Sequence, residues 1–413
     1  MAASDKQKGA VRNAGEIGYL VPQFPGQTHI FFWRELAEME RRGAAVSLLS
    51  TRPPPAGLIA HRWSAEAMAR TTYLASADPR AGLAALGRAP LTELARELRT
   101  AGRPFLRDVA MSLPAARRLV RLAAARGIGH VHVHSCGRAA LIAALARRMG
   151  GPRYSLTLHG PLSDYGPGQA FKWRHAAFAT VITQTLLAEA RAALGRDMPD
   201  RVLVQPMGVD VDSYRRDRPY APPTAGAPLR IFACGRLNVV KGHADLLQAV
   251  ALLRARGVDA RLEIAGEDDA GGHGYHPVLQ ARLEELGLAE HATLLGAIDA
   301  GEVRQRLVAA DLFVLASWHE PLGVAYMEAM ACGVPTIGTD AGGVRELIRD
   351  GRDGLLVPPR DPETLADAIA ALAADPDRCA ALSRQGRLRI EESFSSARGA
   401  ELLLREAART ASA

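Results

Sequence analysis

Two segments in the second half of the chain carry charged side chains suited to binding a phosphorylated ligand. Arg236 and Lys241 share the loop CGRLNVVKG, where two cations can converge on one diphosphate. The spacing is not that of a P-loop. Glu320 and Glu328 lie eight residues apart in HEPLGVAYMEAMACGVP. On one helix they would be ~12 Å apart along the axis, which suits two parts of one extended ligand better than a single metal ion.

A helix is expected to begin near Pro321–Gly323, shortly after the aliphatic run Leu312–Leu315. Ligands of doubly wound sheets bind beyond the carboxyl ends of such strands, and a helix N-terminus there binds anions through its free N–H groups. Simpler interpretations stay open. The helix dipole alone would favour Glu320 at this position, and Glu328 would suit a solvated helix face. Arg236 and Lys241 would suit an ordinary solvated loop surface.

The first half offers candidates at the ends of its predicted strands. His159 closes the segment TLHG at the rim of the expected sheet, although a lone histidine is more often structural. Gly26 follows the first strand in PGQT, where a glycine lets the backbone approach a ligand. His130, His132 and His134 alternate along one strand and share a face. No carboxylate or cysteine joins them at ligand spacing, so inward-facing polar groups are favoured and no metal is predicted.

Short aliphatic runs alternate with helical segments along the chain, which predicts parallel sheets covered by helices. The strands expected in the first half are Glu16–Val21, Ala45–Ser50, Ile128–His134, Tyr154–Leu158, Thr180–Thr183 and Val202–Gln205. Those expected in the second half are Leu229–Ala233, Ala260–Ala265, Thr293–Leu295, Leu312–Leu315, Pro335–Gly338 and Gly354–Val357. One sheet holding all of them would be unusually large, so the fold class expected is α/β with two doubly wound domains.

A change in composition predicts where the two domains meet. Residues 1–212 are expected to form the first domain, with a helical insertion over about 52–127 that shows no clear strands. Residues 213–228 include the proline-rich segment DRPYAPPTAGAP and are interpreted as a linker. Residues 229–394 form the second domain, and a helix over 395–413 is surplus to it and is expected to cross back to the first.

The composition restricts the class of partner. The 413 residues carry a net charge of +7, and almost all of the basic residues are arginines. This excess suits phosphate-bearing ligands or an anionic membrane surface, whereas no nucleic-acid-binding motif accompanies it. The four cysteines form no CxxC pair, which excludes a zinc ribbon or a redox dithiol.

No apolar run in the sequence is long enough to span a bilayer, and the polar N-terminus does not resemble a signal peptide. A cytoplasmic protein is therefore expected. Residues 102–127 alternate arginine with leucine, valine and alanine. This segment could lie on the anionic inner face of the plasma membrane, and a solvated basic helix face is an equally good interpretation.

Five motifs of the second half resemble those of one enzyme family. They are GR-x4-KG, IAGED, LLGAI, the E-x7-E pair and DAGGVRELI–DGRDGLLVPP, in this order over Leu229–Phe394. They are similar to the motifs of the retaining glycosyltransferases of family 4, whose GT-B architecture consists of two facing Rossmann-like domains with a cleft between them. The first half matches less specifically, and its opening is similar to transferases that build exopolysaccharides or lipid-linked oligosaccharides.

The resemblance implies a role for each matching residue. Arg236 and Lys241 would hold the donor diphosphate, Glu320 the donor sugar and Glu328 the ribose. The other donor-binding residues implied are Gly296, Ala297 and Ile298 at the base, the backbone amides of Leu322, Gly323 and Val324, and Gly26 over the phosphates. His159 would touch the sugar near the reacting carbon. The catalytic set implied is therefore His159, Arg236, Lys241 and Glu320.

The function implied is that of a retaining, metal-independent hexosyltransferase without a cofactor. It would move a sugar from a UDP- or GDP-linked donor to a glycan or polyprenyl-linked acceptor of polysaccharide biosynthesis. No carboxylate is obviously placed as a nucleophile, so same-face attack is favoured, with the departing phosphate accepting the proton. Two alternatives stay open: a nucleotide-sugar epimerase on the same fold, and an inactive membrane-associated scaffold. The segment PGQT, and Pro321 in place of a common glycine, depart from the family pattern.

Overall fold

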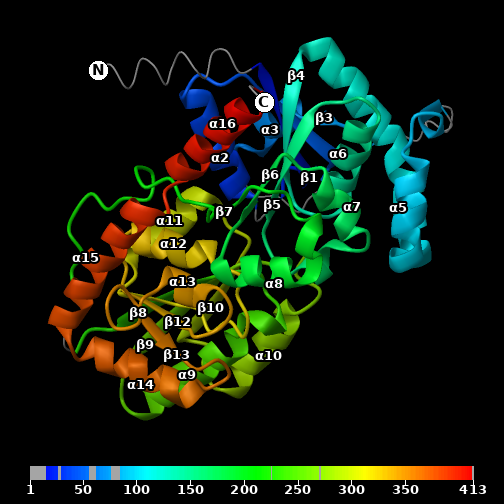
Figure 1. Ribbon diagram of the computed structural model, residues 1–413. Coiled ribbons are helices and arrows are strands. Elements are labelled where there is room, and N and C mark those ends of the chain that lie inside the picture. The colour runs from blue at the N-terminus through cyan, green and yellow to red at the C-terminus, as the bar shows by residue number, and fades with distance from the viewer. Residues whose placement is uncertain are drawn as a thin grey trace, which may run out of the picture. The chain divides into compact units, whose positions relative to one another are not determined.

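The computed structural model describes residues 15–26, 29–54, 62–75, 84–224, 226–268 and 271–411. Gln27 and Thr28, which belong to the predicted glycine loop PGQT, lie outside the described residues. The chain forms two compact units (Figure 1). The first unit comprises Met1–Gly57, Trp63–Pro206 and Ala397–Ala413, and the second comprises Leu58–Arg62 and Met207–Ser396.

The first unit contains a seven-stranded parallel sheet in the order β3-β2-β1-β4-β5-β6-β7. Its strands are β1 (Glu16–Gln23), β2 (Val46–Arg52), β3 (Thr72–Tyr73), β4 (Ile128–His134), β5 (Arg153–Leu158), β6 (Phe178–Val181) and β7 (Val202–Val204). The six expected strands are confirmed, with ends shifted by one or two residues. The interpretation of 52–127 as free of strands is wrong at β3, because an edge strand of two residues is too short to show an alternating pattern.

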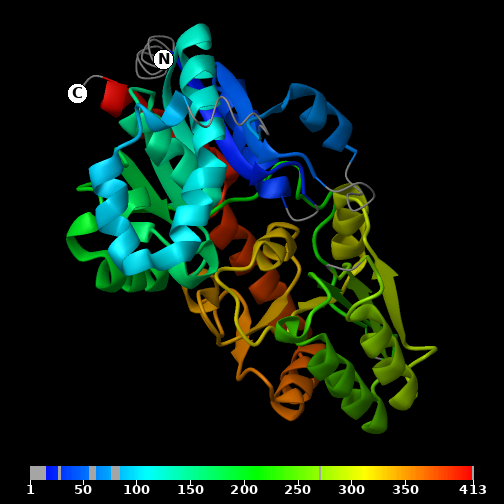
Figure 2. The same ribbon diagram turned by 90° about the vertical axis from the view of Figure 1, so that its right-hand side faces the viewer.

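Helices cover this sheet. They are α2 (Ile30–Arg41), α3 (Ser64–Arg70), α5 (Leu91–Arg126), α6 (Arg138–Arg148), α7 (Gln169–Arg174) and α8 (Gln184–Leu194), with short 3-10 helices at Leu162–Tyr165 and Gly195–Asp197. The apolar run Ala139–Ala146 of α6 is buried throughout, because α6 packs on the sheet and against α5. The long helix α5 is bent at Gly102, whose φ is 69° (Figures 1 and 2).

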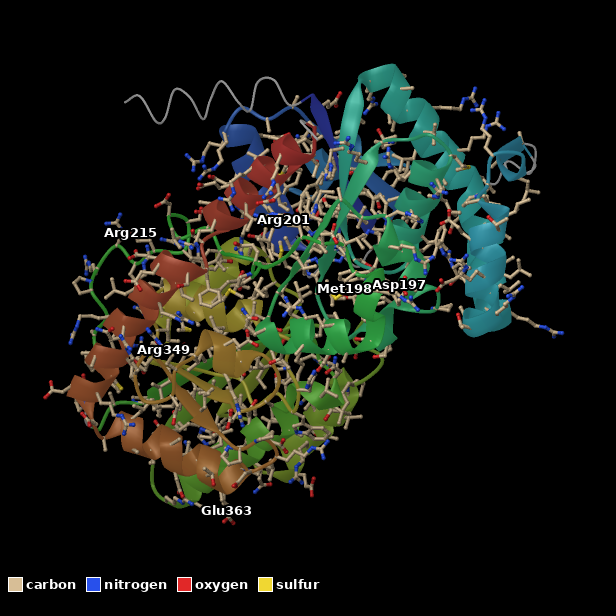
Figure 3. All side chains as sticks on the ribbon, in the orientation of Figure 1. Asp197, Met198, Arg201, Arg215, Arg349 and Glu363 are labelled. Atoms are coloured by element: carbon tan, nitrogen blue, oxygen red, sulfur yellow. The ribbon has the colours of Figure 1, made fainter. Side chains whose placement is uncertain are left out.

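The C-terminal helix α16 (Ser396–Ala411) packs on the first unit. Arg201, labelled in Figure 3, donates two hydrogen bonds of 2.5 and 2.7 Å to Glu406 of this helix. Near its end, Thr410 Oγ1 lies 3.3 Å from His130 Nδ1. The first unit is therefore assembled from both ends of the chain.

The second unit contains a six-stranded parallel sheet in the order β10-β9-β8-β11-β12-β13. Its strands are β8 (Leu229–Cys234), β9 (Ala260–Ala265), β10 (Ala292–Gly296), β11 (Leu312–Val314), β12 (Thr336–Thr339) and β13 (Leu355–Val357). Its helices are η3 (Val239–Lys241), α9 (His243–Ala255), α10 (His276–Glu285), α11 (Ala300–Ala309), α12 (Val324–Ala331), α13 (Val344–Leu347), α14 (Pro362–Ala373) and α15 (Pro376–Ser393). The strands are largely aliphatic because helices bury the sheet on both faces.

Residues 213–228, interpreted from sequence as a linker, lie in the second unit. Arg216 donates hydrogen bonds to the carbonyls of Val308 (2.6 Å) and Cys332 (2.7 Å), and the Tyr220 hydroxyl donates to Asp311 O (2.8 Å). The chain passes between the units at Pro206–Met207 and at Ser396–Ala397. Among the helices described, none is long and apolar enough to cross a membrane.

Candidate active site

Arg236, Lys241 and Glu320 lie at the carboxyl edge of two adjacent strands. β8 pairs in parallel with β11, so the loops that follow these strands leave the sheet as neighbours. The backbone N–H of Trp318 donates to Val240 O at 2.8 Å, which ties the two loops together. The Lys241 ammonium forms an ion pair with the Glu320 carboxylate. Charged groups of opposite sign therefore face each other where ligands of such sheets bind.

Gly242 makes this approach possible. Its φ is +66°, and a Cβ atom at this position would lie 1.8 Å from the carbonyl oxygen of Ala316. No side chain fits there, because the obstacle is backbone. The glycine of GR-x4-KG therefore holds the Lys241 loop against the residues that follow β11.

The two glutamates of the E-x7-E pair are both buried. Glu320 is 8% exposed and Glu328 is 7% exposed. The expectation that both lie on one helix is wrong, because α12 begins at Val324 and Glu320 precedes it. The alternative of a solvated Glu328 is also wrong. Burial, with a smaller effect of the Glu328 charge, raises the pKa of Cys234, at the end of β8, to about 12.

The turn that starts α12 contains Leu322, Gly323 and Val324, as expected from the sequence. Gly323 has φ +95°, and a Cβ there would lie 2.3 Å from the Tyr326 ring. The first N–H groups of α12 therefore come directly after Glu320, a position at which a helix binds anions.

The loop after β12 fixes the backbone of Glu320, a role that the sequence did not predict. The N–H of Gly343 donates to Glu320 O at 2.9 Å. Gly342 has φ +66°, and a Cβ there would lie 2.3 Å from the same oxygen. The paired glycines of the DAGGVRELI motif were the available signal in the sequence, because this close approach to Glu320 leaves no room for a side chain.

The predicted base segment lies on the same edge. Gly296, Ala297 and Ile298 follow β10, and Gly266 N donates to Gly296 O at 2.9 Å. Gly266, in IAGED, has φ +150°, and a Cβ there would lie 1.8 Å from Gly235 O. The ends of β10, β9 and β8 are therefore locked together, which places Gly296–Ile298 and Arg236 on one continuous edge.

His243 is a second residue that sequence reasoning missed. It is fully buried at the start of α9, and its Nε2–H donates to Arg236 O at 3.2 Å. Burial lowers the pKa of His243 to about 4, so the ring stays neutral. The histidine thereby fixes the backbone of Arg236 while the Arg236 side chain remains exposed. A histidine directly after KG was the available signal.

In the first unit, His159 follows β5 and joins the histidines of β4. Its Nε2 lies 3.2 Å from His134 Nδ1, and its ring centroid lies 5.4 Å from that of Phe32. Burial, with a smaller effect of His134, lowers the pKa of His159 well below its usual value. His159 is therefore neutral and held by rings on more than one side.

The histidines of β4 all face the interior, as the alternation predicted. His132 lies between two hydroxyls, with Nδ1 2.7 Å from Ser155 Oγ and Nε2 2.8 Å from Thr157 Oγ1. His130 lies 2.8 Å from Ser155 Oγ. Over the residues that the structure describes, no three acidic, histidine or cysteine side chains are grouped as metal ligands.

Gly26 follows β1 and the Phe24–Pro25 peptide. A Cβ atom on Gly26 would lie 2.6 Å from His29 Nδ1. The N–H of His29 also donates to Gly26 O at 3.0 Å. A side chain at position 26 would therefore displace the ring of His29, and the contact of Gly26 with donor phosphates stays a prediction.

We expect stability to fall as the pH falls from about 6.5 to about 4. The pKa values of His130 and His243 are lowered to about 4 by burial, so over this interval the unfolded chain binds protons that the native state does not. At pH ~4.5 each residue contributes a loss of about 2–3 kcal/mol. Denaturant unfolding of His130→Asn should show a shallower loss between pH 7 and 4.5.

The control is His319→Asn, which removes an exposed histidine. It should lose stability with pH as steeply as the wild type. An unchanged slope in His130→Asn would contradict the assignment.

The chain resembles known proteins over most of its length. Residues 221–389 match a family model described as glycosyl transferases group 1, and residues 31–213 match one described as glycosyltransferase family 4. A GDP-mannose-dependent alpha-(1-6)-phosphatidylinositol monomannoside mannosyltransferase of Mycolicibacterium smegmatis is 31% identical over 296 residues, which are 66% of this chain and 74% of the relative. A D-inositol 3-phosphate glycosyltransferase of Pseudarthrobacter chlorophenolicus is 33% identical over 221 residues, 51% of each chain.

Solved structures resemble the whole chain. Anabaena HepE, solved in complex with UDP and glucose, has a TM-score of 0.73 at 18% identity and covers 96% of this chain and 100% of its own. Sucrose-phosphate synthase of Thermosynechococcus elongatus has a TM-score of 0.70 at 19% identity, with 96% and 98% covered. These likenesses confirm the fold class, two doubly wound α/β units.

Proposed function

Because the chain belongs to the group 1 glycosyltransferases of family 4, a retaining family of hexosyltransferases with the GT-B fold, we propose that it transfers a sugar from a nucleoside diphosphate to a lipid-linked or glycan acceptor. The observation that carries the proposal is the pairing of Lys241 with Glu320 beside the start of α12. A cation, a carboxylate and a helix N-terminus are the groups that a diphosphate joined to a sugar requires. Family membership favours transfer over the epimerase and scaffold alternatives.

The residues of the second unit would act on the leaving group. As the bond between the anomeric carbon and the phosphate oxygen breaks, negative charge grows on the diphosphate. Arg236, Lys241 and the first N–H groups of α12 would stabilise that charge where it develops. The acceptor oxygen would bond to the anomeric carbon on the face that the phosphate leaves, and its proton would pass to the departing phosphate. Trapping a covalent glycosyl-enzyme would contradict this scheme.

The donor that we propose to test first is GDP-mannose. The relative from Mycolicibacterium smegmatis is named for this donor and for a phosphatidylinositol monomannoside acceptor. HepE, which resembles the chain in fold, was solved with UDP and glucose, so UDP-glucose is the second donor to test. Gly296–Ile298 would read the base through backbone atoms.

Calorimetric titration of GDP, UDP and ADP into the protein tests the donor site. We expect one diphosphate to bind with a Kd on the order of micromolar. The matching nucleotide sugar, incubated with mannosylated phosphatidylinositol or a polyprenyl diphosphate sugar, should give a product whose new linkage keeps the donor's anomeric configuration by NMR. If none of the three diphosphates binds, the assignment of the donor site is wrong.

The exposed face of α5 supports a lipid-linked acceptor. Arg96, Arg99, Arg103 and Arg107 are exposed along this helix, and Leu106 beside them is 54% exposed. Arginines interleaved with exposed apolar side chains suit an anionic bilayer surface. We therefore propose that the protein binds such a surface peripherally through α5.

Vesicle sedimentation tests the role of α5. Each basic residue near an anionic surface contributes about 1 kcal/mol, so Arg99→Glu/Arg103→Glu/Arg107→Glu should reduce binding to phosphatidylserine vesicles by about 100-fold or more. Reversal of three exposed arginines of the second unit is the control and should have a smaller effect: Arg352→Glu/Arg378→Glu/Arg384→Glu. Equal binding to neutral and anionic vesicles would contradict the proposal.

A further inference from the structure

The amino edge of the first sheet contains a cavity of about 320 Å³, which is within the size range of small-molecule sites. Side chains from the beginnings of three strands line it: Glu16 of β1, His130 of β4 and Arg153 of β5. Arg147, in the last turn of α6, and Thr410 of α16 also line it. All of these residues belong to the first unit.

The cavity lies at the edge of the sheet opposite to His159. Parallel strands begin at one edge and end at the other, and His159 follows the end of β5. His130 and His134 are four residues apart on β4, which corresponds to roughly 13 Å. A ligand in the cavity would therefore be separate from the groups assigned to sugar transfer.

Two arginines give one side of the cavity a positive charge. Arg153 is the register partner of His130, and Arg147 precedes the short connection between α6 and β5. Over the described part of the chain, neither guanidinium forms an ion pair, whereas the neighbouring Arg148 pairs with Glu93. Burial, with a smaller effect of the Arg153 charge, lowers the pKa of His130 to about 4, so this ring is neutral. One unpaired surface arginine is ordinary, but two that border one cavity suit a bound anion.

A carboxylate marks the other side of the cavity. β1 pairs with β4, and β4 pairs with β5, so Glu16 and Arg153 begin strands that are separated by one strand. Two strand spacings place their backbones ~10 Å apart. Glu16 accepts a hydrogen bond from Ser47, and its carboxylate has the capacity to accept others from hydroxyl groups. The cavity thus offers cations at one end and an acceptor at the other.

We propose that this cavity binds a small sugar phosphate, with the phosphate between Arg147 and Arg153 and the hydroxyl groups at Glu16. A phosphate monoester carries a charge of about −1.5 to −2 at pH 7, which two guanidinium groups neutralise through paired N–H···O bonds. Its polyol part supplies the hydroxyl donors that a carboxylate accepts. The site does not depend on the proposed function, because no residue assigned to sugar transfer lines it.

A ligand in this cavity is expected to stabilise the docked position of α16. Thr410 Oγ1 lies 3.3 Å from His130 Nδ1, and Ala407 and Ala411 of the same helix also line the cavity. A ligand held by β5 and α16 together binds only when the helix is docked, so its binding free energy favours docking. The sugar phosphate thereby acts as an effector of the C-terminal helix.

Phosphorus-31 NMR titration of the full chain with glucose 6-phosphate tests the site without any sugar donor. We expect a Kd on the order of 0.1–1 mM, as is usual for a small polar ligand. Arg147→Gln/Arg153→Gln should weaken binding by about tenfold or more, because both sets of phosphate contacts are lost. Arg148→Gln is the matched control. It removes an adjacent exposed arginine that does not line the cavity, and should bind the probe as the wild type does.

Lys241→Ala distinguishes this cavity from the proposed donor site. Its affinity for glucose 6-phosphate should equal that of the wild type, since Lys241 belongs to the second unit. Loss of binding in Lys241→Ala would place the probe at the donor site and would overturn the proposal. Wild-type affinity in Arg147→Gln/Arg153→Gln would overturn it as well.

Glu16→Gln tests which end of the ligand lies at β1. Glutamine keeps an oxygen for Ser47 but removes the charged acceptor. The variant should weaken binding of glucose 6-phosphate by about threefold or more and leave binding of inorganic phosphate unchanged, because phosphate alone does not reach β1. An equal response of the two probes would show that the sugar does not lie at Glu16.

Hydrogen exchange locates the ligand on the chain. Saturating glucose 6-phosphate should slow the exchange of backbone amides in the last turns of α16 and at the beginning of β5. Amides of the loop 235–242 in the second unit should exchange at an unchanged rate. Protection confined to that loop would overturn the site, and an unchanged rate in α16 would overturn the effector role.

Discussion

Lys241→Ala is expected to lower sugar transfer by about 10²- to 10³-fold, the largest effect of any single substitution in the site. The variant removes the cation that faces the diphosphate and leaves the Glu320 carboxylate, 8% exposed, without its ion-pair partner. That unpaired charge repels the incoming phosphates. Initial rates of product formation and calorimetric titration of the nucleoside diphosphate measure the two effects separately.

A double variant separates catalysis from stability in this pair. Loss of one partner of a buried ion pair costs about 3–5 kcal/mol, whereas replacement of both by neutral side chains costs little. Lys241→Met/Glu320→Gln should therefore recover most of the stability lost in Lys241→Ala but none of the turnover. Recovery of turnover in the double variant would show that Lys241 serves the fold alone.

Arg230→Ala is the control for the loss of a positive charge. Arg230 also belongs to β8 but pairs with Asp311, before β11, away from the carboxyl edge. Its removal should lower stability, because Asp311 is buried, but should leave the rate of sugar transfer within about twofold of the wild type, because the pair lies away from the donor site. Arg236→Ala, by contrast, should cost about 10²-fold.

Gly242→Ala is expected to disrupt the donor site without removing any charged group. The new methyl group would meet Ala316 O, which lies 1.8 Å from the Cβ position, and the φ of +66° adds backbone strain. The Lys241 loop has to move away from the end of β11. We expect a loss of about 2–4 kcal/mol in unfolding free energy and of about tenfold or more in affinity for the nucleoside diphosphate.

Gly257→Ala is the matched control for this substitution. Gly257 follows α9 with φ +83°, and among the described residues no atom lies within 4 Å of its Cβ position. The same backbone strain without the clash should cost about 1 kcal/mol and leave nucleotide binding intact. Equal losses in the two variants would show that the clash at Gly242 is relieved at no cost.

The strands could be predicted because buried parallel strands are aliphatic throughout. The edge of the sheet that carries the candidate site could be predicted because ligands bind beyond the carboxyl ends of such strands. That logic placed Arg236, Lys241 and Glu320 at one edge of the sheet, where the structure has them. It missed β3, which is too short to carry a pattern. The individual donor contacts of Gly26, Leu322 and Gly296–Ile298 stay predictions.

The contacts that fix the site depend on packing between distant segments and could not be predicted from local patterns. The burial of Glu328 depends on the packing of α12 against α15 and β12. The approach of Glu35, His134 and His159 needs α2, the end of β4 and the segment after β5 to meet within the first unit. For Glu35 the sequence shows only an acidic residue in an amphipathic helix, which is typical of a solvated face.

The placement of α16 has a consequence for exchanging parts between relatives. Because the chain enters the second unit at Met207 and leaves it at Ser396, the second unit is nearly continuous in sequence, whereas the first is split. A chimera that replaces only the residues before Met207 would leave the native α16 on a foreign first unit without Arg201 and Glu35, and would lose the Arg201–Glu406 pair and the close contact at Gly399. A chimera with a new first unit therefore also needs the C-terminal helix of the same source protein, joined at Ser396–Ala397.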